Sequence, residues 1–240
     1  MYKVIVLIPF YNELNNLDEL KKLIKSMSIL DIDFKFVFCD DNSNDGTEAS
    51  LSNYLNQNNQ NYEVIKNNTN LGHGGSLIRL SKLEQIKDFD FVLTLDFDFC
   101  YMHSDLVAIL NSNLKDKIVI GKRKHFDEGV FRQLITSCSE LIIFFKSYRV
   151  FKDTNCPVRL YPAFMYINIW QQIPENTLIP NMFSTLIMLK NKQLFSRMPL
   201  GKNKNLQIDS VSWGSGVFSK KIKIMYFSFK SFKQLISYKC

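Results

Sequence analysis

Short apolar runs alternate with segments of helical periodicity through the first half of the chain, and this alternation constrains the fold more than any other feature. Apolar runs that predict strands cover residues 3–9, 34–39, 62–65, 89–95 and 117–121. Segments whose apolar residues recur at helical spacing cover residues 15–30, 47–55, 76–86 and 104–114. Strands that alternate with helices predict an α/β fold, in which helices flank a mostly parallel central sheet.

The second half of the chain is less regular. We expect helices over residues 130–151 and 182–189 and a strand over residues 207–213. In the last segment, four apolar side chains fall on one face of a predicted helix: Phe229, Phe232, Leu235 and Ile236. This helix, with its lysines turned away, either packs on the rest of the protein or lies at the surface of an anionic membrane.

The composition is that of a globular protein, since 46% of the residues are apolar and 22% are charged. No run approaches the roughly 18 uncharged apolar residues of a membrane-spanning helix, and the N-terminal apolar run is too short for a signal peptide. Five cysteines without a CxxC pair indicate free thiols in a reducing compartment rather than a zinc site. We therefore expect a cytoplasmic protein that is at most peripheral on the cytoplasmic face of a membrane.

The net charge of +7 is concentrated at the C-terminal end of the chain. No acidic residue follows Asp209, whereas six lysines do. The rest of the chain is nearly neutral, which argues against a nucleic-acid-binding surface. The basic segment is instead suited to an anionic membrane surface as partner.

Acidic residues follow three of the predicted strands where those strands end. Glu13 follows the first strand, Asp40 and Asp41 end the second, and Asp96 and Asp98 follow the fourth. Ligands of open α/β sheets bind beyond the carboxyl ends of the strands, so these acids are predicted to converge. Converging carboxylates repel one another without a cation, and Asp96-x-Asp98 offers hard oxygen ligands that suit Mg²⁺ or Mn²⁺. The sequence thus predicts a divalent cation and a ligand with hydrogen-bond donors, such as a nucleobase and ribose.

Four separated motifs occur in a fixed order: VIVLIPFYNE, FVFCDDNSNDGT, NNTNLGHGGS and VLTLDFDF. Together they resemble glycosyltransferase family 2, whose members have the Rossmann-like GT-A fold, and the resemblance covers about residues 3–125. Within that family the sequence is most similar to the polyprenyl- and dolichyl-phosphate mannosyl- and glucosyltransferases. The resemblance implies a GT-A domain over residues 1–217, with a nucleotide-binding half at 1–125 and an acceptor half at 126–217, before a basic, aromatic segment at 218–240. It also implies metal-dependent sugar transfer, with inversion, from a nucleoside-diphosphate sugar to a polyprenyl phosphate.

The same resemblance assigns roles to individual residues. Those that it places around the nucleotide are Pro9, Tyr11, Glu13, Asp40, Asp41 and Asp96. Asp96 and Asp98 match the metal-binding DxD motif, and Cys100 stands where the family has a glutamine beside the metal. Those that it places at the reacting phosphates are Asp98, Arg123, Arg132 and Arg159. From the residues alone, Arg132 also fits a solvated helix position, and Arg159 also fits an ion pair with Asp153.

Two features of the second half bear on the acceptor. Relatives carry an R-x-x-G-x-S motif, whereas residues 212–217 lack its arginine. Either Lys202, Lys204 or Lys220 supplies the charge, or the acceptor differs, or the activity is weakened. A hydroxyl acceptor needs a carboxylate base, but the segment IPNMFSTLIMLK contains no acid, and we interpret Glu175 as a loop carboxylate. A phosphate is already ionised and is therefore favoured. Two alternatives stay open: transfer to a sugar hydroxyl in surface polysaccharide synthesis, and a non-catalytic module that binds a nucleotide sugar.

Overall fold

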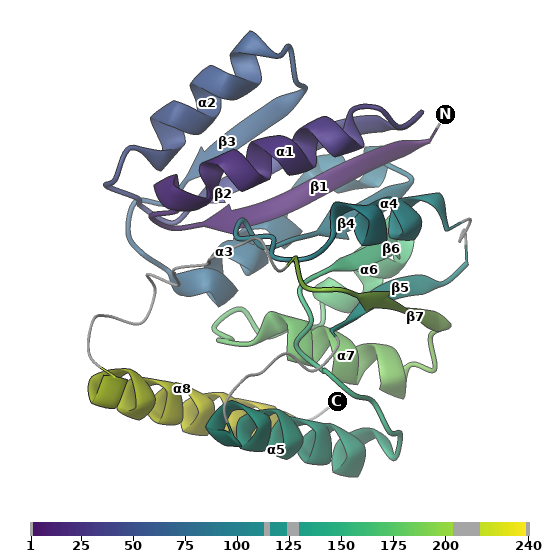
Figure 1. The fold of residues 1–240 in the computed structure, drawn as a ribbon. Coiled ribbons are helices and arrows are strands. Elements are labelled where there is room, and N and C mark those ends of the chain that lie inside the picture. Colours follow the sequence, from purple (N-terminus) through teal and green to yellow (C-terminus); the bar gives the residue numbers. More distant parts are fainter. Residues whose placement is uncertain (1, 113–115, 124–129, 204–216, 239–240) are drawn as a thin grey trace.

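The computed structural model describes residues 2–112, 116–123, 130–203 and 217–238, without the side chains of 130–132 and 217–221. Within this part of the chain, seven strands form one sheet at the centre of the molecule (Figure 1). The strands are β1 (Lys3–Phe10), β2 (Asp33–Asp40), β3 (Tyr62–Lys66), β4 (Phe91–Thr94), β5 (Ile118–Arg123), β6 (Arg159–Pro162) and β7 (Phe195–Leu200). Their order across the sheet is β3-β2-β1-β4-β6-β5-β7.

All of these strands except β6 run in one direction. β1 pairs in parallel with β2 and β4, β2 with β3, and β5 with β7. β6 is antiparallel to both of its neighbours, β4 and β5. Every residue of β1 after Lys3 is buried, as expected for a central strand that is covered on both faces. The predicted α/β fold with a mostly parallel sheet is therefore confirmed.

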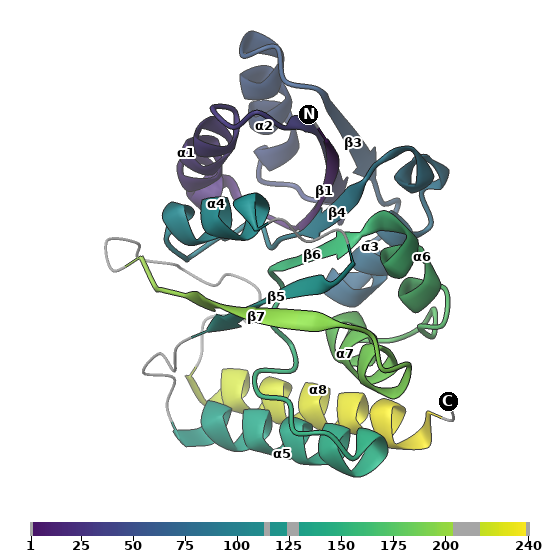
Figure 2. The ribbon, with the colours of Figure 1, turned by 90° about the vertical axis from the view of Figure 1, so that its right-hand side faces the viewer.

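Helices cover both faces of the sheet (Figure 2). They are α1 (Leu17–Met27), α2 (Thr47–Gln57), α3 (Gly72–Ser81), α4 (His103–Asn111), α5 (Val130–Ser147), α6 (Ala163–Trp170), α7 (Pro180–Lys190) and α8 (Val217–Ser237). The helices α1, α2 and α4 lie on one face, and α3, α6 and α7 pack together on the other. In both views α5 and α8 lie side by side beyond α7.

The predicted elements match the structure better in the first half than in the second. One helix predicted over residues 76–86 begins earlier, at Gly72, and ends at Ser81, because a separate 3-10 turn covers Glu84–Asp88. The elements β6, α6 and β7 were not predicted, since strands and helices this short show little periodicity. The strand predicted over residues 207–213 lies outside the described residues.

The C-terminal helix α8 buries only part of the predicted apolar face. Phe229 and Ile236 are 71% and 61% exposed, whereas Ser228, Ser231 and Leu235 are buried. Phe232 also packs against the core, so two of the four residues on the predicted apolar face contact the rest of the protein and two are exposed. None of the described helices, α8 included, is long and apolar enough to cross a membrane.

Candidate active site

The acidic residues of the sequence lie together at one edge of the sheet. β1 lies between β2 and β4, and the three strands are parallel, so their carboxyl ends open on the same side. This order brings Glu13, the pair Asp40 and Asp41, and the pair Asp96 and Asp98 to the same edge. The strand order thus produces the convergence that the sequence predicts, whereas the role of each side chain stays a prediction.

Hydrogen bonds fasten the loop after β1 to the loop after β2. The amide of Asn12 donates to Oγ of Ser43 (3.0 Å), and the amide of Glu13 donates to Oγ1 of Thr47 (2.9 Å). Asn12 turns the chain with a left-handed φ of 53°, which asparagine tolerates better than most residues. Tyr11 and Glu13 are therefore held on a turn that is anchored at both ends, and Tyr11 is partly exposed there.

Asp41 is buried and binds the start of α3. Its Oδ1 accepts hydrogen bonds from the amide of Leu71 (2.7 Å) and from Nδ2 of Asn67 (2.7 Å). Its Oδ2 accepts a third hydrogen bond from the amide of Gly72 (2.8 Å). A carboxylate at a helix N-terminus satisfies unpaired amides and interacts favourably with the helix dipole. Asp41 therefore fixes the position of α3 at the edge of the site.

One carboxylate oxygen of Asp40, the neighbouring acid, accepts no hydrogen bond from the described residues. Its side chain is fully buried, and Oδ1 accepts a hydrogen bond from the amide of Ser43 (2.8 Å). Oδ2 has no hydrogen-bond partner among the described residues, and Nζ of Lys66 lies 3.7 Å away. Pro9, near the end of the adjacent β1, is also buried. Buried carboxylate oxygens rarely lack a hydrogen-bond donor, so Oδ2 is the candidate in this pair to accept a hydrogen bond from a ligand.

Asp96 and Asp98 belong to a cluster of like charges. Oδ1 of Asp96 lies 2.9 Å from Nε2 of His73, at the start of α3. Burial, together with the charges of Asp96 and Glu13, raises the pKa of Asp98 to about 8. Burial and the charge of Asp96 also raise the pKa of Glu13, against a hydrogen bond from Asn16 that lowers it. Both pKa values are raised first by burial and then by the charges of neighbouring carboxylates, and a bound cation would favour the ionised forms against both effects.

The donors of this cluster fit a divalent cation that takes further ligands from elsewhere. Asp96 and Asp98 supply hard oxygen atoms, but no three His, Cys, Asp or Glu side chains in the described residues are grouped to hold a metal alone. Mg²⁺ commonly binds one or two carboxylates and completes its coordination with water and phosphate oxygens. Burial and the charge of Asp98 raise the pKa of the Cys100 thiol to about 11, and a soft thiol is in any case a poor ligand for Mg²⁺.

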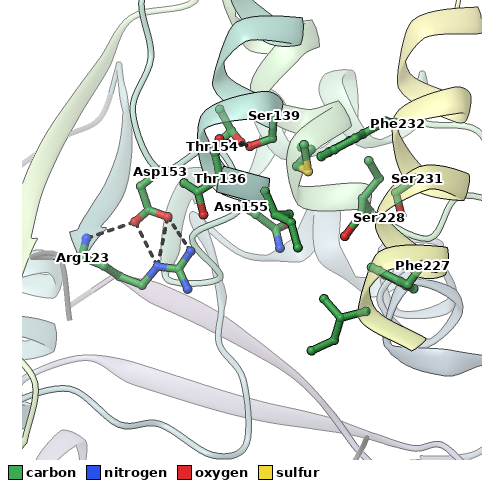
Figure 3. Close-up of a pocket in the computed structure, with 14 residues that line it drawn as sticks. Arg123, Thr136, Ser139, Asp153, Thr154, Asn155, Phe227, Ser228, Ser231 and Phe232 are labelled. Carbon is green, nitrogen blue, oxygen red and sulfur yellow. Dashed lines mark hydrogen bonds and ion pairs between the residues drawn. The ribbon is translucent and has the colours of Figure 1, made fainter. Parts of the chain in front are cut away.

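A second polar region lies at the end of β5, beside a cavity of about 200 Å³ between α5, α7 and α8. At one end of this cavity Nε and Nη2 of Arg123 donate to the carboxylate of Asp153, with Nε 3.0 Å from Oδ1 (Figure 3). The pKa of Arg123 lies above its usual value. Burial lowers this pKa, but the hydrogen bonds and the charge of Asp153 raise it by more than burial lowers it. Thr136 of α5 and Ser231 of α8 also line the cavity.

Arg159, which the sequence places at the reacting phosphates, lies inside the protein. The side chain is 0% exposed, and its guanidinium donates to the carbonyl oxygens of Cys156 (2.7 Å) and Thr154 (2.9 Å) and to Oγ1 of Thr185 (3.0 Å). The sequence also suggested an ion pair between Arg159 and Asp153. In the structure Asp153 pairs with Arg123 instead. Arg159 therefore fastens the loop before β6 to α7, and its donors are used inside the protein.

Several predicted residues lie outside the part of the chain that the structure describes. These are the side chains of Arg132 and Lys220, residue Lys204, and residues 212–216 of the segment that lacks the arginine. The predicted roles of these residues stay predictions. Lys202 is described and is exposed, and it forms an isolated β-bridge with Tyr101.

Sequence reasoning did not single out two polar residues that support the site. Asn67 is buried, and its Nδ2 donates to Oγ of Ser76 (2.9 Å) as well as to Asp41. Nη1 of Arg79 donates to the carbonyl oxygen of Lys66 (2.9 Å). Asn67 belongs to the quoted NNTN motif, but its three asparagines look alike in the sequence, and only the fold shows which one is buried.

Comparison of the sequence with known proteins finds one family and a distant relative. The family model described as glycosyl transferase family 2 matches residues 5–169, which is more than half of the chain. The undecaprenyl-phosphate 4-deoxy-4-formamido-L-arabinose transferase of Proteus mirabilis is 26% identical over 185 residues. That match covers 76% of this chain but 56% of the relative, so the chain spans little more than half of the relative's length.

Solved structures with the same fold include two sugar transferases. Mannosyl-3-phosphoglycerate synthase from Rubrobacter xylanophilus has a TM-score of 0.65 at 14% identity, covering 99% of this chain and 76% of its own. Glucosyl-3-phosphoglycerate synthase from Mycobacterium tuberculosis, crystallised with Mn²⁺, UDP-glucose and glycerol 3-phosphate, has a TM-score of 0.63 at 14% identity. That second match covers 98% of this chain and 79% of the synthase. At these identities the likeness establishes the fold, which is the GT-A fold.

Proposed function

The chain belongs to glycosyl transferase family 2, and from that premise we propose that it moves a sugar from a nucleoside-diphosphate sugar to a polyprenyl phosphate. Membership of the family makes the protein a glycosyltransferase. The polyprenyl phosphate, the inverting course and the divalent cation are our proposals. We also propose that the protein works at the cytoplasmic face of a membrane, because its acceptor would be a lipid.

On the donor side, Oδ2 of Asp40 supports a nucleobase site, because among the described residues it has an ion pair with Lys66 but no hydrogen bond. A base N–H group would satisfy this buried oxygen, and Tyr11 lies on the anchored turn beside it. Asp41 would act indirectly, by holding α3 in place. We assign Glu13 to the same pocket, since its charge contributes to the acidic cluster around Asp98.

At the diphosphate, Asp96 and Asp98 would hold Mg²⁺ or Mn²⁺. Such an ion, when bound, neutralises the negative charge that develops on a departing diphosphate. The synthase of similar fold that was crystallised with Mn²⁺ and UDP-glucose supports this choice of cation. The raised pKa of Asp98 supports it independently, because that carboxylate is poorly compensated by its protein neighbours.

One observation carries the choice of acceptor: every carboxylate in residues 130–203 is paired with a cation. The pairs are Glu140 with Lys152, Asp153 with Arg123, and Glu175 with Lys82. A carboxylate held by lysine or arginine is stabilised in its ionised form and makes a weak general base. A hydroxyl acceptor would need such a base, whereas a phosphate oxygen attacks without one. The name of the Proteus mirabilis relative gives the same class of acceptor.

In the proposed reaction, an oxygen of the acceptor phosphate attacks the anomeric carbon on the face opposite the diphosphate. The new carbon–oxygen bond forms as the bond to the diphosphate breaks, and the nucleoside diphosphate leaves with the bonding electrons. Arg123 is our candidate for holding the acceptor phosphate, because Asp153 fixes the orientation of its guanidinium.

A transfer assay tests the proposal. Purified protein is incubated with Mn²⁺ or Mg²⁺, a panel of radiolabelled nucleotide sugars, and a short-chain polyprenyl phosphate, and the label in the organic phase is counted. We expect metal-dependent labelling of the lipid that Asp98→Ala abolishes and that Asp31→Ala, a change at an exposed loop residue, leaves intact.

The same assay separates the alternatives. The acids Asp127, Glu128 and Asp209 lie outside the described residues, and for a phosphate acceptor Asp127→Asn, Glu128→Gln and Asp209→Asn should all retain lipid labelling. Label in an oligosaccharide but not in the lipid would replace our proposal by a hydroxyl acceptor. Tight nucleotide binding with neither product would identify a non-catalytic module.

A further inference from the structure

The helices α5 and α8 form a layer of their own beyond α7 (Figures 1 and 2). Nζ of Lys146, near the end of α5, donates to the carbonyl oxygens of Ile236 (2.7 Å) and Tyr238 (2.7 Å) at the end of α8. Buried residues on the inner sides, Ile143 of α5 and Leu235 of α8, join the rest of the core. The opposite sides of both helices therefore face outward together.

The outward side of α5 is a stripe of apolar residues. These residues recur at intervals of four and three positions, which places them on one helical face: Leu134, Cys138, Leu141 and Phe145, continued by Tyr148 just after the helix. All of them are exposed, with Phe145 at 64% and Tyr148 at 84%. A soluble surface seldom leaves so regular an apolar stripe in water unless it has a partner.

The outward side of α8 continues the same surface. Its exposed apolar residues are Ile222, Met225, Tyr226, Phe229 and Ile236, again at helical spacing. Phe229 and Ile236 belong to the apolar face for which the sequence left both protein packing and a membrane surface open, and the tertiary structure leaves these two residues exposed. We call the exposed residues of α5 and α8 together the α5–α8 face.

The charges around the α5–α8 face are basic. Lys223, Lys230 and Lys233 are exposed on α8, and Arg149 is exposed just after α5. The sequence of α8 contains no acidic residue, and Glu140, the only acid in the sequence of α5, is paired with Lys152. A second copy of the chain on this face would bring lysines against lysines. An anionic lipid surface instead offers phosphate groups to the lysines and an acyl boundary to the aromatic and aliphatic residues.

We propose that the α5–α8 face docks on an anionic membrane surface, with its apolar stripe at the boundary between headgroups and acyl chains. The lysine side chains are long enough to reach the headgroups from within the stripe. The proposal does not depend on the acceptor, because it concerns binding and not transfer. If both hold, docking brings the cavity beside Arg123, which the inner sides of α5 and α8 line, close to the lipid headgroups.

Vesicle co-sedimentation tests the docking. Full-length protein is mixed with vesicles of phosphatidylcholine, with or without phosphatidylglycerol, and the partition coefficient is measured. We expect binding that requires phosphatidylglycerol and weakens with salt. The double variant Lys230→Glu with Lys233→Glu should lower the partition coefficient by more than about fivefold for each lysine changed. Loss of one basic group lowers it roughly fivefold, and glutamate reverses the charge as well. Lys25→Glu, a change at an exposed lysine of α1, is the matched control and should have far less effect.

The apolar contribution is tested in the same way. Phe145→Gln with Phe229→Gln should lower the partition coefficient by about tenfold or more, because both rings would leave the acyl boundary. Phe164→Gln is the matched control, since Phe164 is 57% exposed on α6, away from the proposed face. Circular dichroism verifies that each variant is folded.

A chemical probe gives an independent readout. Cys138 is exposed within the stripe, so vesicles with phosphatidylglycerol should slow its alkylation, whereas vesicles of phosphatidylcholine alone should not. Failure of the wild-type protein to bind either vesicle would overturn the proposal, as would equal binding by the double variants. A dimer in lipid-free solution that Phe145→Gln with Phe229→Gln dissociates would assign the face to a second copy instead.

Discussion

Replacement of Asp41 by asparagine tests whether this acid holds the fold of the site. The wild-type carboxylate accepts hydrogen bonds from the amides of Leu71 and Gly72, at 2.7 and 2.8 Å, and from Nδ2 of Asn67 at 2.7 Å. Asparagine has the same shape but replaces one oxygen by an NH₂ group. At least one of the three N–H donors would then face the NH₂ group of asparagine. The remaining hydrogen bonds would be made to a neutral amide oxygen instead of a charged carboxylate.

The expected loss of stability follows from these contacts. A hydrogen bond to a charged group contributes about 1.5–3 kcal/mol, and one between neutral groups about 0.5–1.5 kcal/mol. The variant loses one hydrogen bond, and two others become bonds between neutral groups, which lowers the free energy of unfolding. Part of this loss is offset because the desolvation cost of a buried amide is smaller than that of a buried carboxylate. The net loss should be roughly 3 kcal/mol. For a chain of this size that corresponds to a fall in Tm of about 6–12 °C.

Thermal unfolding of the ligand-free protein, followed by circular dichroism, measures this fall. Asp31→Asn, at an exposed loop position, is the control and should stay within about 0.5 kcal/mol of wild type. An unchanged Tm for Asp41→Asn, together with a much weaker affinity for nucleotide, would refute the reasoning. That result would mean that Asp41 binds the ligand directly and that its contacts to α3 contribute little.

Three further predictions concern the site and its surroundings. Asp98→Asn should reduce transfer by at least about a hundredfold, and chelation of divalent cations should reduce wild-type transfer to a similar level in the same assay. Arg159→Lys should lower Tm and leave the KM for the acceptor unchanged, because lysine cannot reproduce the forked contacts of a buried guanidinium. Peptide mapping after alkylation at pH 8 should find Cys138 labelled and Cys156 protected, since Cys138 is exposed whereas burial and the charge of Asp153 raise the pKa of Cys156 to about 12.

The order of elements in the first half was predictable because local pattern and tertiary structure agree there. The buried strand β1 reads as an unbroken apolar run, and the amphipathic helix α1 buries Leu20, Leu23 and Met27 at helical spacing. In the second half the two disagree. β6 has four residues and pairs antiparallel with β4, far away in sequence, so that no local periodicity could reveal it.

The candidate site was predictable to the level of clusters but not of single side chains. Asp40 and Asp41 are adjacent and chemically identical, yet both oxygens of Asp41 accept hydrogen bonds within the protein, whereas Oδ2 of Asp40 accepts none from the part of the chain that the structure describes. The difference arises because successive residues at the end of a strand point in opposite directions. The amides that meet Asp41 belong to α3, whose starting point the sequence did not show.

The sequence by itself determined the fold class, the family and the edge of the sheet where the acids gather, because these depend on periodicity and on motifs that are local in the chain. The tertiary structure alone decided which charged groups are already satisfied and which faces remain open. The buried Arg159 donates to Thr185, which is distant in sequence, and α8 leaves Phe229 exposed while Leu235 of the same predicted apolar face is buried. Burial is a property of contacts between distant segments, and a linear pattern records only the preferences that those contacts can override.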